Sequence, residues 1–337
     1  MKDAVIVSGA RTPVGRFGGA FKDVSSPDLG SQAIKAALER AGITPDMVDE
    51  VVIGNAVQAA EAGYAARLAS LKSGIPHDVP TIAINRQCSS GLEAINMAAQ
   101  LIRTGEAEIA VAGGTENMSQ VPYMIEYQAR FDGLRMGNST LVDGLTEGLG
   151  CPVNRYHMGV TAENVAERFG VSRKDQDELA FISHQRASTA ASEGRFTNQI
   201  TEIEVQQRRS DPVTVSEDEG PRADTTIESL SVLRPVFKKD GTVTAGNASS
   251  INDGAAAVVM MSAERAAALG LKPRMKWHTR GVAGVDPAIM GIGPVPAVQK
   301  ALGKAGMEVN DIDVIELNEA FASQALYCMR ELNLDID

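Results

Sequence analysis

Apolar positions along the first third of the chain alternate between strand-like and helix-like patterns. Residues 4–10 (AVIVSGA), 81–87 (TIAINRQ) and 107–114 (AEIAVAGG) are short apolar runs typical of buried strands. Residues 33–41 have the spacing of an alanine-rich amphipathic helix, and Gly42 stands where a helix C-cap is expected. The apolar run at 50–55 (EVVIGN) then predicts another strand. This alternation predicts an α/β fold in which helices cover a sheet.

A second segment repeats this helix–loop–strand unit. Residues 33–56 (AIKAALERAGITPDMVDEVVIGNA) and 297–320 (AVQKALGKAGMEVNDIDVIELNEA) align without gaps at an offset of 264 positions. The identical positions include the glycine after each helix and the aspartate before each apolar run. Each copy predicts a helix, a glycine C-cap, a short loop and a strand, so we expect two related α/β halves.

The repeat also sets the expected domain boundaries. Residues 1–119 form the first half, residues 120–242 a polar, loop-rich insertion, and residues 243–337 the second half. The insertion contains helical patterns at 161–170 and 172–194, with Ser172 as a candidate N-cap, and long insertions commonly carry substrate contacts. The second half reaches only the equivalent of Ser73, so we expect it to lack a counterpart of residues 81–114.

Composition narrows the class of protein. The chain has 337 residues, 44% of them apolar, and no run approaches the roughly 18 apolar residues of a membrane helix. Three widely spaced cysteines favour neither a disulfide framework nor a metal site, and no signal segment precedes residue 4, which predicts a cytoplasmic protein. The net charge of −11 argues against a nucleic-acid surface. Basic residues at 208–209, 222 and 238–239 form either a local anion site or a solvated face.

Cys88 stands at the junction between the run at 81–87 and a helical pattern behind it. Ser89 and Ser90 are candidate caps, Leu92, Ile95, Ala99 and Ile102 form the expected buried face, and Gly91 permits a close approach. A helix N-terminus stabilises a thiolate, and a strand–turn–helix junction exposes a nucleophile. Free cysteines are also among the most buried residues, so the pattern leaves open a nucleophile and a small packed side chain.

Six motifs in order resemble the thiolase family and span essentially the whole chain. They are VIVSGARTPVGRFGGAF (5–21), NRQCSSGLEAI (85–95), AGGTENMSQVPY (112–123), YHMGVTAE (156–163), the stretch 218–256 and NEAFA (318–322). The resemblance implies duplicated α/β halves in a layered α-β-α arrangement with an inserted loop domain. It also implies acyl transfer between CoA thioesters, most like the acetyl-CoA acetyltransferases, in an enzyme of fatty acid metabolism that forms a homodimer or homotetramer.

The resemblance assigns roles to ten residues. Cys88 is similar to the cysteine that carries the acyl group, and Asn318 to the asparagine that holds a water in the oxyanion site. The substrate-binding positions that it implies are His157 and Met158 on the pantetheine channel, Arg222 and Ser229 at the adenine and phosphate end, Ser249 near the pantetheine amides, and Met290, Ala320 and Phe321 on the pocket wall. Coenzyme A and acyl-CoA are substrates in this assignment, and no tightly bound cofactor or metal is implied.

The family's Gly-His-Pro and Cys-x-Gly segments do not occur in the printed sequence, and Cys328 lies in an expected helix without glycine. We therefore expect this chain alone to be inactive, as a thiolase fragment or as a thiolase-like protein that only binds acyl-CoA or oligomerises. A 3-ketoacyl-CoA thiolase of broader chain length is an alternative. A cysteine hydrolase pairing Cys88 with His157 is disfavoured, because nothing nearby would orient the base.

Overall fold

The computed structural model describes residues 1–134 and 136–336. The chain divides into two compact units. Unit 1 comprises Met1–Gly148, Gly194–Gly220 and Ile251–Trp277, and unit 2 comprises Leu149–Glu193, Pro221–Ser250 and His278–Asp337. These units differ from the expected ranges 1–119, 120–242 and 243–337, because a long strand from the third range completes the sheet of the first.

Unit 1 is built on a mixed seven-stranded sheet. Six strands follow the order β13-β1-β12-β5-β3-β4, and the seventh, β2, pairs with β12 outside this order. β3, β4 and β5 run parallel, whereas β12 is antiparallel to both of its long neighbours, β1 and β5. The sheet strands are β1 (Ala4–Arg11), β2 (Gly15–Arg16), β3 (Glu50–Gly54), β4 (Thr81–Ile84), β5 (Ile109–Asn117), β12 (Asn252–Ser262) and β13 (Met275–Lys276).

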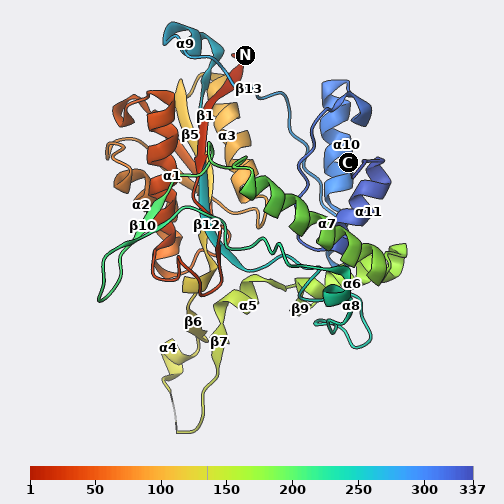
Figure 1. Cartoon of the computed structure of the whole chain (residues 1–337). Helices are drawn as coiled ribbons and strands as arrows, with labels where there is room; N and C mark the ends of the chain where they lie inside the picture. Colours follow the sequence, from red (N-terminus) through yellow and green to blue (C-terminus); the bar gives the residue numbers. More distant parts are fainter. Residues whose placement is uncertain (135, 337) are drawn as a thin grey trace. The chain divides into compact units, whose positions relative to one another are not determined.

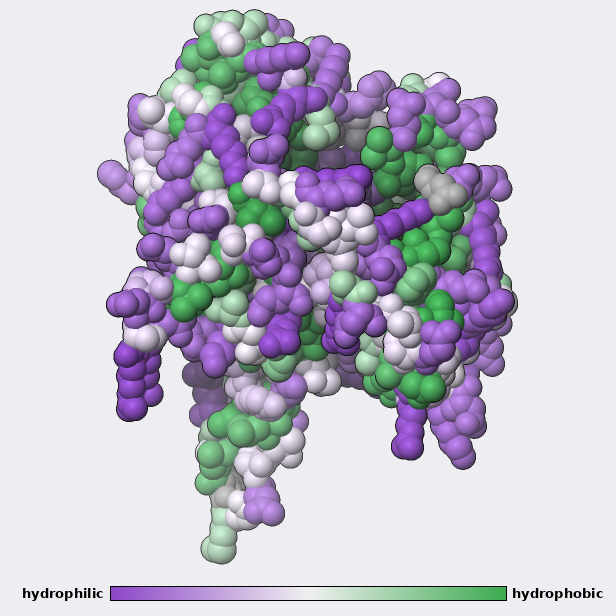
Figure 2. Space-filling model, viewed as in Figure 1, coloured by the Kyte–Doolittle hydropathy of each residue, from purple (hydrophilic) through white to green (hydrophobic). Residues whose placement is uncertain are grey.

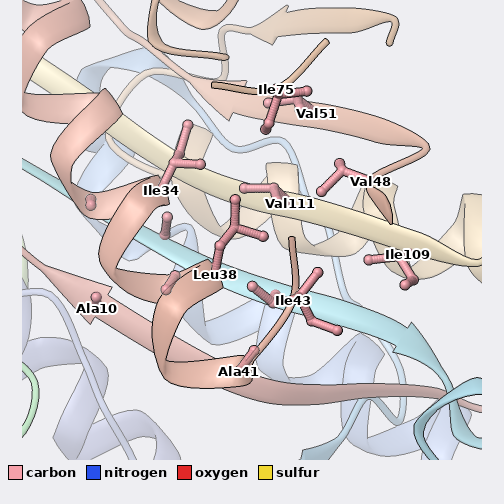
Figure 3. Close-up of a cluster of buried hydrophobic side chains, with 14 of the residues drawn as sticks. Ala10, Ile34, Leu38, Ala41, Ile43, Val48, Val51, Ile75, Ile109 and Val111 are labelled. Atoms are coloured by element: carbon pink, nitrogen blue, oxygen red, sulfur yellow. The ribbon is translucent and has the colours of Figure 1, made fainter. Parts of the chain in front are cut away.

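Helices cover both faces of this sheet. α1 (Ser26–Ala41) and α2 (Ala65–Lys72) lie on one face and α3 (Ser90–Thr104) on the other (Figure 1). Successive strand residues alternate between the two cores: Val51 packs with the α1 side and Val52 with the α3 side. Figure 3 shows Ile34 and Leu38 of α1 among the strand side chains of the first core. The α-β-α layering expected for the first half is therefore present in unit 1.

The remaining elements of unit 1 are short and lie outside the main sheet. β6 pairs with β7 and β10 pairs with β11 as separate two-stranded sheets. The bounds of these elements are β6 (Tyr123–Ile125), α4 (Ala129–Asp132), β7 (Leu141–Asp143), α5 (Gly144–Gly148), β10 (Ile203–Val205), β11 (Val213–Val215) and α9 (Ala263–Ala268), with 3-10 turns at Pro45–Met47, Ala60–Tyr64 and Met118–Gln120.

Unit 2 is mainly helical. Leu179 of α7 packs with Ala322 and Ala325 of α11 in one small core, and Val295 of α10 packs with Cys328 in another. The bounds are β8 (Gly150–Cys151), β9 (Tyr156–His157), α6 (Met158–Phe169), α7 (Arg173–Ser192), α8 (Ile227–Ser231), a 3-10 segment η4 (Pro287–Ile292), α10 (Pro294–Ala305), η5 (Val309–Asp311) and α11 (Ala322–Leu332).

The internal repeat is only partly reproduced in structure. α1 and α10 end at equivalent residues, followed by Gly42 and Gly306 with φ of 65° and 67°, and the 3-10 turns Pro45–Met47 and Val309–Asp311 coincide at the same offset. The strand expected at 313–318 is wrong: within the described residues that segment joins no ladder, and Val314 is 79% exposed. β3 exists because β4 and β5 flank it, and apolar residues without such partners do not make a strand.

Among residues 1–134 and 136–336, no helix combines the length and the hydrophobicity needed to cross a bilayer.

Candidate active site

Cys88 occupies an exposed turn between β4 and α3 in unit 1. The preceding residue, Gln87, has φ of 49°, a left-handed conformation that is strained for a residue with a side chain. Such strain turns the chain sharply from the strand into the helix, so the side chain at the turn points outward. The interpretation of Cys88 as a small buried side chain is therefore wrong.

The serines beside Cys88 do not cap α3 as expected. The Ser89 side chain accepts no capping bond from α3, and its hydroxyl instead donates to the Arg86 carbonyl at 2.9 Å. Ser90 Oγ accepts from the Arg86 backbone N–H at 2.8 Å and donates to the Gln87 carbonyl at 2.5 Å. These bonds brace the turn around the cysteine, because both hydroxyls fold back onto residues 86 and 87.

The close approach expected at Gly91 exists, but a different glycine permits it. A β-carbon on Gly54 of β3 would stand 2.4 Å from the Ser90 carbonyl carbon, whereas one on Gly91 would make only ordinary contacts at 3.9 Å. The start of α3 therefore lies directly against the end of β3.

The buried face of α3 differs from the prediction at one position. Leu92 is 64% exposed rather than buried, while Ala99 and Ile102 are buried as expected.

The other two cysteines are poor nucleophiles. Cys151 and Cys328 are buried, and all three cysteines are free thiols. Burial raises the pKa of Cys328 to about 11, and its Sγ donates to the Gly291 carbonyl at 3.4 Å. Of the three thiols, Cys88 alone is exposed to a reactant.

An aromatic cluster in unit 2 gathers two of the candidate residues. The His157 ring stacks on Phe237 with centroids 4.7 Å apart and planes at 12°, and Phe321 meets Phe237 edge-on at 6.1 Å. Gly159 makes room for Phe237, because a β-carbon there would lie 2.3 Å from the ring. Met158 is half-buried at the start of α6, next to this cluster in the chain.

His157 serves as the N-cap of α6. Its Nδ1 accepts a hydrogen bond from the Gly159 backbone N–H at 3.0 Å, which leaves Nε2 to carry the proton in the neutral ring. Burial lowers the pKa of His157 below its usual value. The structure therefore favours a neutral, structural histidine with one nitrogen already engaged.

Two segments of unit 2 run side by side next to this cluster. The Ser249 backbone N–H donates to the Ala320 carbonyl at 3.0 Å, and Ala248 and Phe321 form an antiparallel bridge. Ser249 is exposed and lies two residues beyond Asn247. Asn318 is also exposed, in an irregular segment four residues before α11 rather than at the end of a strand. This pairing places Ser249 beside Ala320, two residues after Asn318 in the same segment.

Arg222 and Ser229 flank the start of α8. The Arg222 backbone N–H donates to His184 Nδ1 on α7, and burial, with Arg222 as the next cause, lowers the pKa of His184. The Arg222 side chain is exposed and so available to an anion. The Ser229 hydroxyl is engaged in the α8 capping box with Thr226, which gives it a structural role.

Met290 is half-buried in η4, which α6 holds through a hydrogen bond from Asn164 Nδ2 to the Ala288 carbonyl at 2.9 Å. Among the described residues, no group of three or more His, Cys, Asp or Glu side chains is arranged to hold a metal ion.

Two residues of this region, Phe237 and Asn247, are not indicated by the sequence pattern. Phe237 lies in a loop without a periodic apolar pattern. Aromatic residues make up only 4% of the chain, but their rarity does not indicate which residues Phe237 contacts. Asn247 reads as a turn residue, and its buried hydrogen bonds are visible only in the fold.

Two family models match almost the whole chain. "Thiolase, N-terminal domain" matches residues 4–264 and "Thiolase, C-terminal domain" matches residues 271–337. The expectation of an incomplete second half is not supported by these matches.

Curated relatives and solved structures agree with the family models. The chain is 50% identical over 336 residues to an acetyl-CoA acetyltransferase of Pseudomonas aeruginosa, covering 99% of this chain and 85% of the relative. It is 48% identical to a probable acetyl-CoA acyltransferase of Staphylococcus epidermidis, covering 100% of this chain and 85% of that relative. The crystal structure of the Bacillus anthracis acetyl-CoA acetyltransferase is similar with a TM-score of 0.96 at 45% identity, covering 99% of this chain and 84% of that chain. Human mitochondrial 3-ketoacyl-CoA thiolase in complex with CoA is similar with a TM-score of 0.94 at 43% identity and the same coverage.

Proposed function

The chain belongs to the thiolase family, and from this premise we propose that Cys88 carries the acyl group in acyl transfer between CoA thioesters. The observation that carries the proposal is the exposed Cys88 behind the strained Gln87, at the junction of β4 and α3. Coenzyme A and its thioesters are the substrates, and the chemistry needs no tightly bound cofactor.

In the cleavage direction, the Cys88 thiolate attacks the 3-keto carbon of acetoacetyl-CoA. A C–S bond forms, the bond between the keto carbon and the adjacent CH₂ breaks, and that CH₂ takes a proton as acetyl-CoA leaves. A second CoA then loses its thiol proton, and its sulfur takes the acetyl group as the bond to the Cys88 sulfur breaks and the thiolate is returned. The proton lost in this step balances the one that the CH₂ carbon took up. Asn318 would hold a water that donates to the carbonyl oxygen as negative charge develops there.

The remaining candidates would bind CoA. We propose that Arg222, an exposed residue, binds the phosphates, and that Ser249 contacts the pantetheine amides. His157, Met158, Ala320 and Phe321 would line the channel, and Met290 would complete its wall. The engaged Ser229 hydroxyl would contribute through the geometry of α8 rather than through a direct bond.

The test is acetoacetyl-CoA cleavage in the presence of CoA, followed by loss of the enolate absorbance, with trapping of acetyl-Cys88 by mass spectrometry. Trapping needs only one acetyl transfer to sulfur, so it tests Cys88 even when turnover is slow. Cys88→Ala should abolish the acetyl label and whatever cleavage the parent shows, whereas Cys328→Ala, the matched control at a buried thiol, should abolish neither. Acetylation at another residue would contradict the assignment. Longer 3-ketoacyl-CoA substrates in the same assay test the alternative of a broader thiolase, which the likeness to the human enzyme supports.

The expectation that these 337 residues alone lack robust turnover stays a prediction. General acid–base catalysis typically accelerates a reaction about 10²–10⁴-fold. In the family the Gly-His-Pro and Cys-x-Gly segments supply it, and none of the four histidines and three cysteines lies in such a segment. The same assay decides it, since turnover that depends on Cys88 would contradict the expectation.

We also propose that the chain self-associates through the β6–β7 hairpin and α4. This part of unit 1 projects from the sheet, and Figure 2 shows hydrophobic side chains on it. The exposed apolar residues are Tyr123, Ile125, Tyr127, Phe131, Leu134 and Leu141. Apolar side chains gathered in this way commonly mark an interface. Light scattering behind size exclusion tests it, and a monomer at micromolar concentration would refute it.

A cytoplasmic location is part of the proposal, supported by three free thiols, which suit a reducing compartment.

A further inference from the structure

A buried asparagine, Asn247, joins the two paired segments of unit 2 to the helices beneath them. Its backbone carbonyl accepts from the Ala322 N–H at 2.9 Å, next to the bridge between Ala248 and Phe321. The residue is 3% exposed, and its Oδ1 accepts a hydrogen bond from the Thr244 backbone N–H at 2.8 Å. The residue therefore shapes its own loop and also holds the start of α11.

The carboxamide of Asn247 is fixed by a buried carboxylate on α7. Nδ2 donates to Asp177 Oδ1 at 2.9 Å and to the Thr242 carbonyl at 3.1 Å. Asp177 is 3% exposed, and its other oxygen accepts from Arg173 Nε at 2.8 Å. With both N–H groups and one oxygen lone pair engaged, the carboxamide has one orientation in which its bonds are satisfied.

The network continues beyond Asp177 to the segment of α8. The Arg173 guanidinium also donates to the carbonyls of Leu230 and Leu233, at 2.6 Å and 3.1 Å. Leu230 follows Ser229 directly. A continuous polar chain thus links α8, beside Arg222 and Ser229, to the paired segments that hold Ser249 and Ala320.

Helix α6 also holds the loop that contains Thr242 and Asn247, through hydrogen bonds to its backbone. Glu163 of α6 accepts from the backbone N–H groups of Thr242 and Val243, at 2.8 Å each for the shorter contacts. Gln176 of α7 donates to Thr242 Oγ1 at 3.0 Å. Residues 242 and 243 are therefore anchored whether or not Asn247 is present, so loss of the Asn247 carboxamide should loosen the paired segments rather than the whole loop.

We propose that Asn247 and Asp177 form a positioning pair that sets the 247–249 and 320–322 segments in register, and through them the placement of Ser249 and Asn318 for CoA thioesters. This inference rests on the proposed function for its substrate. Neither side chain needs to touch the substrate, because both act through the backbone that carries the contact residues.

The test compares four variants of the full chain. Asn247→Asp keeps the acceptor for Thr244 but removes both donors and places a carboxylate against Asp177. Asp177→Asn removes the charge at constant size. The exchange Asp177→Asn/Asn247→Asp restores one donor facing one acceptor. Asp175→Asn is the matched control, since it removes an acid from the same helix at an exposed ion pair with Arg330.

Two measurements are made on each variant: residue-resolved hydrogen exchange and the Kd for CoA by calorimetry. We expect each single variant of the pair to speed exchange at the Ser249 and Ala322 amides by about 10- to 100-fold, as for a broken buried hydrogen bond to a charged group. The Kd for CoA should rise at least severalfold, which means weaker binding. The exchanged pair should recover part of both losses, and Asp175→Asn should change neither.

Several results would refute the proposed positioning role of Asn247 and Asp177. Unchanged exchange at Ser249 and Ala322 in Asn247→Asp would do so, and so would equally faster exchange throughout α6 and α7, which indicates a merely structural role. Looser segments with an unaltered Kd for CoA would also refute it. If the parent chain fails to bind CoA, the proposed substrate is wrong for this chain, while the exchange data still decide whether the pair sets the segments.

Discussion

Replacing Gly159 by alanine should destabilise unit 2 although it improves helix propensity. Gly159 lies in the first turn of α6, where alanine would ordinarily be favoured over glycine by about 0.5–1 kcal/mol. A β-carbon there would lie 2.3 Å from the Phe237 ring, and ordinary contact requires at least 3.4 Å. The Phe237 ring must therefore move.

Phe237 has little freedom to move, because it is stacked on His157 and meets Phe321 edge-on. Overpacking of this kind costs about 1–3 kcal/mol, and disturbing one aromatic pair costs about 0.5–1.5 kcal/mol more. Subtracting the gain in helix propensity leaves a net loss of roughly 2 kcal/mol in the free energy of unfolding. If the aromatic cluster lines the channel, binding of CoA thioesters should weaken as well.

Gly303→Ala is the matched control in the same unit. Gly303 is helical and exposed in α10. Apart from its chain neighbours and the adjacent backbone of α10 itself, no atom of the described residues lies within 4 Å of a β-carbon built there. That variant should be stabilised by about 0.5–1 kcal/mol. The two alanine variants are therefore expected to shift the unfolding midpoint in opposite directions.

Thermal and urea unfolding of the two variants and the parent provide the measurement, with Gly159→Ala/Phe237→Leu as a relief variant. The double variant should recover part of the midpoint lost in Gly159→Ala, because the smaller side chain removes the clash. A Gly159→Ala protein as stable as Gly303→Ala would refute the reasoning, since it would mean that Phe237 repacks without cost.

Three further predictions concern reactivity, binding and pH. Cys88 should be alkylated by iodoacetamide well before the two buried cysteines, as peptide mapping would show, and equal labelling of all three would contradict this. Arg222→Ala should weaken CoA binding by about fivefold at low salt and less at high salt, whereas Arg209→Ala should not; equal effects of the two would remove Arg222 from the site. The pKa of His157 is lowered in the fold, so its contribution to stability is present above its unfolded value of 6.5 and is lost as the pH falls through the folded value. His157→Asn keeps an N-cap acceptor without a titrating group, and its unfolding midpoint should fall less between pH 7 and pH 5 than that of the parent or of a variant at the exposed His278, His278→Asn.

Local sequence patterns determined the elements whose stability is local. The helix ending at Gly42, the helix behind Cys88 and the cap of α7 at Ser172 all form where the pattern predicts, because periodicity, capping and turn chemistry act over a few residues. The repeat correctly predicted equivalent helix ends followed by short loops, and the structure adds that both loops contain a 3-10 turn at the same offset. The motif around Cys88 identified the candidate nucleophile and the family.

Only the tertiary structure decided the features that depend on distant partners. The run at 313–318 has strand composition but no strand, because strand formation needs a paired neighbour and not composition alone. β12 enters between β1 and β5 from more than a hundred residues away, and no local signal encodes that pairing. Phe237 joins His157 to Phe321, and Asn247 joins Asp177 to Ala322, through contacts that exist only after the chain has packed. The sequence by itself indicated the candidate nucleophile and the family, and packing alone decided which side chains hold the segments at 247–249 and 320–322 in place.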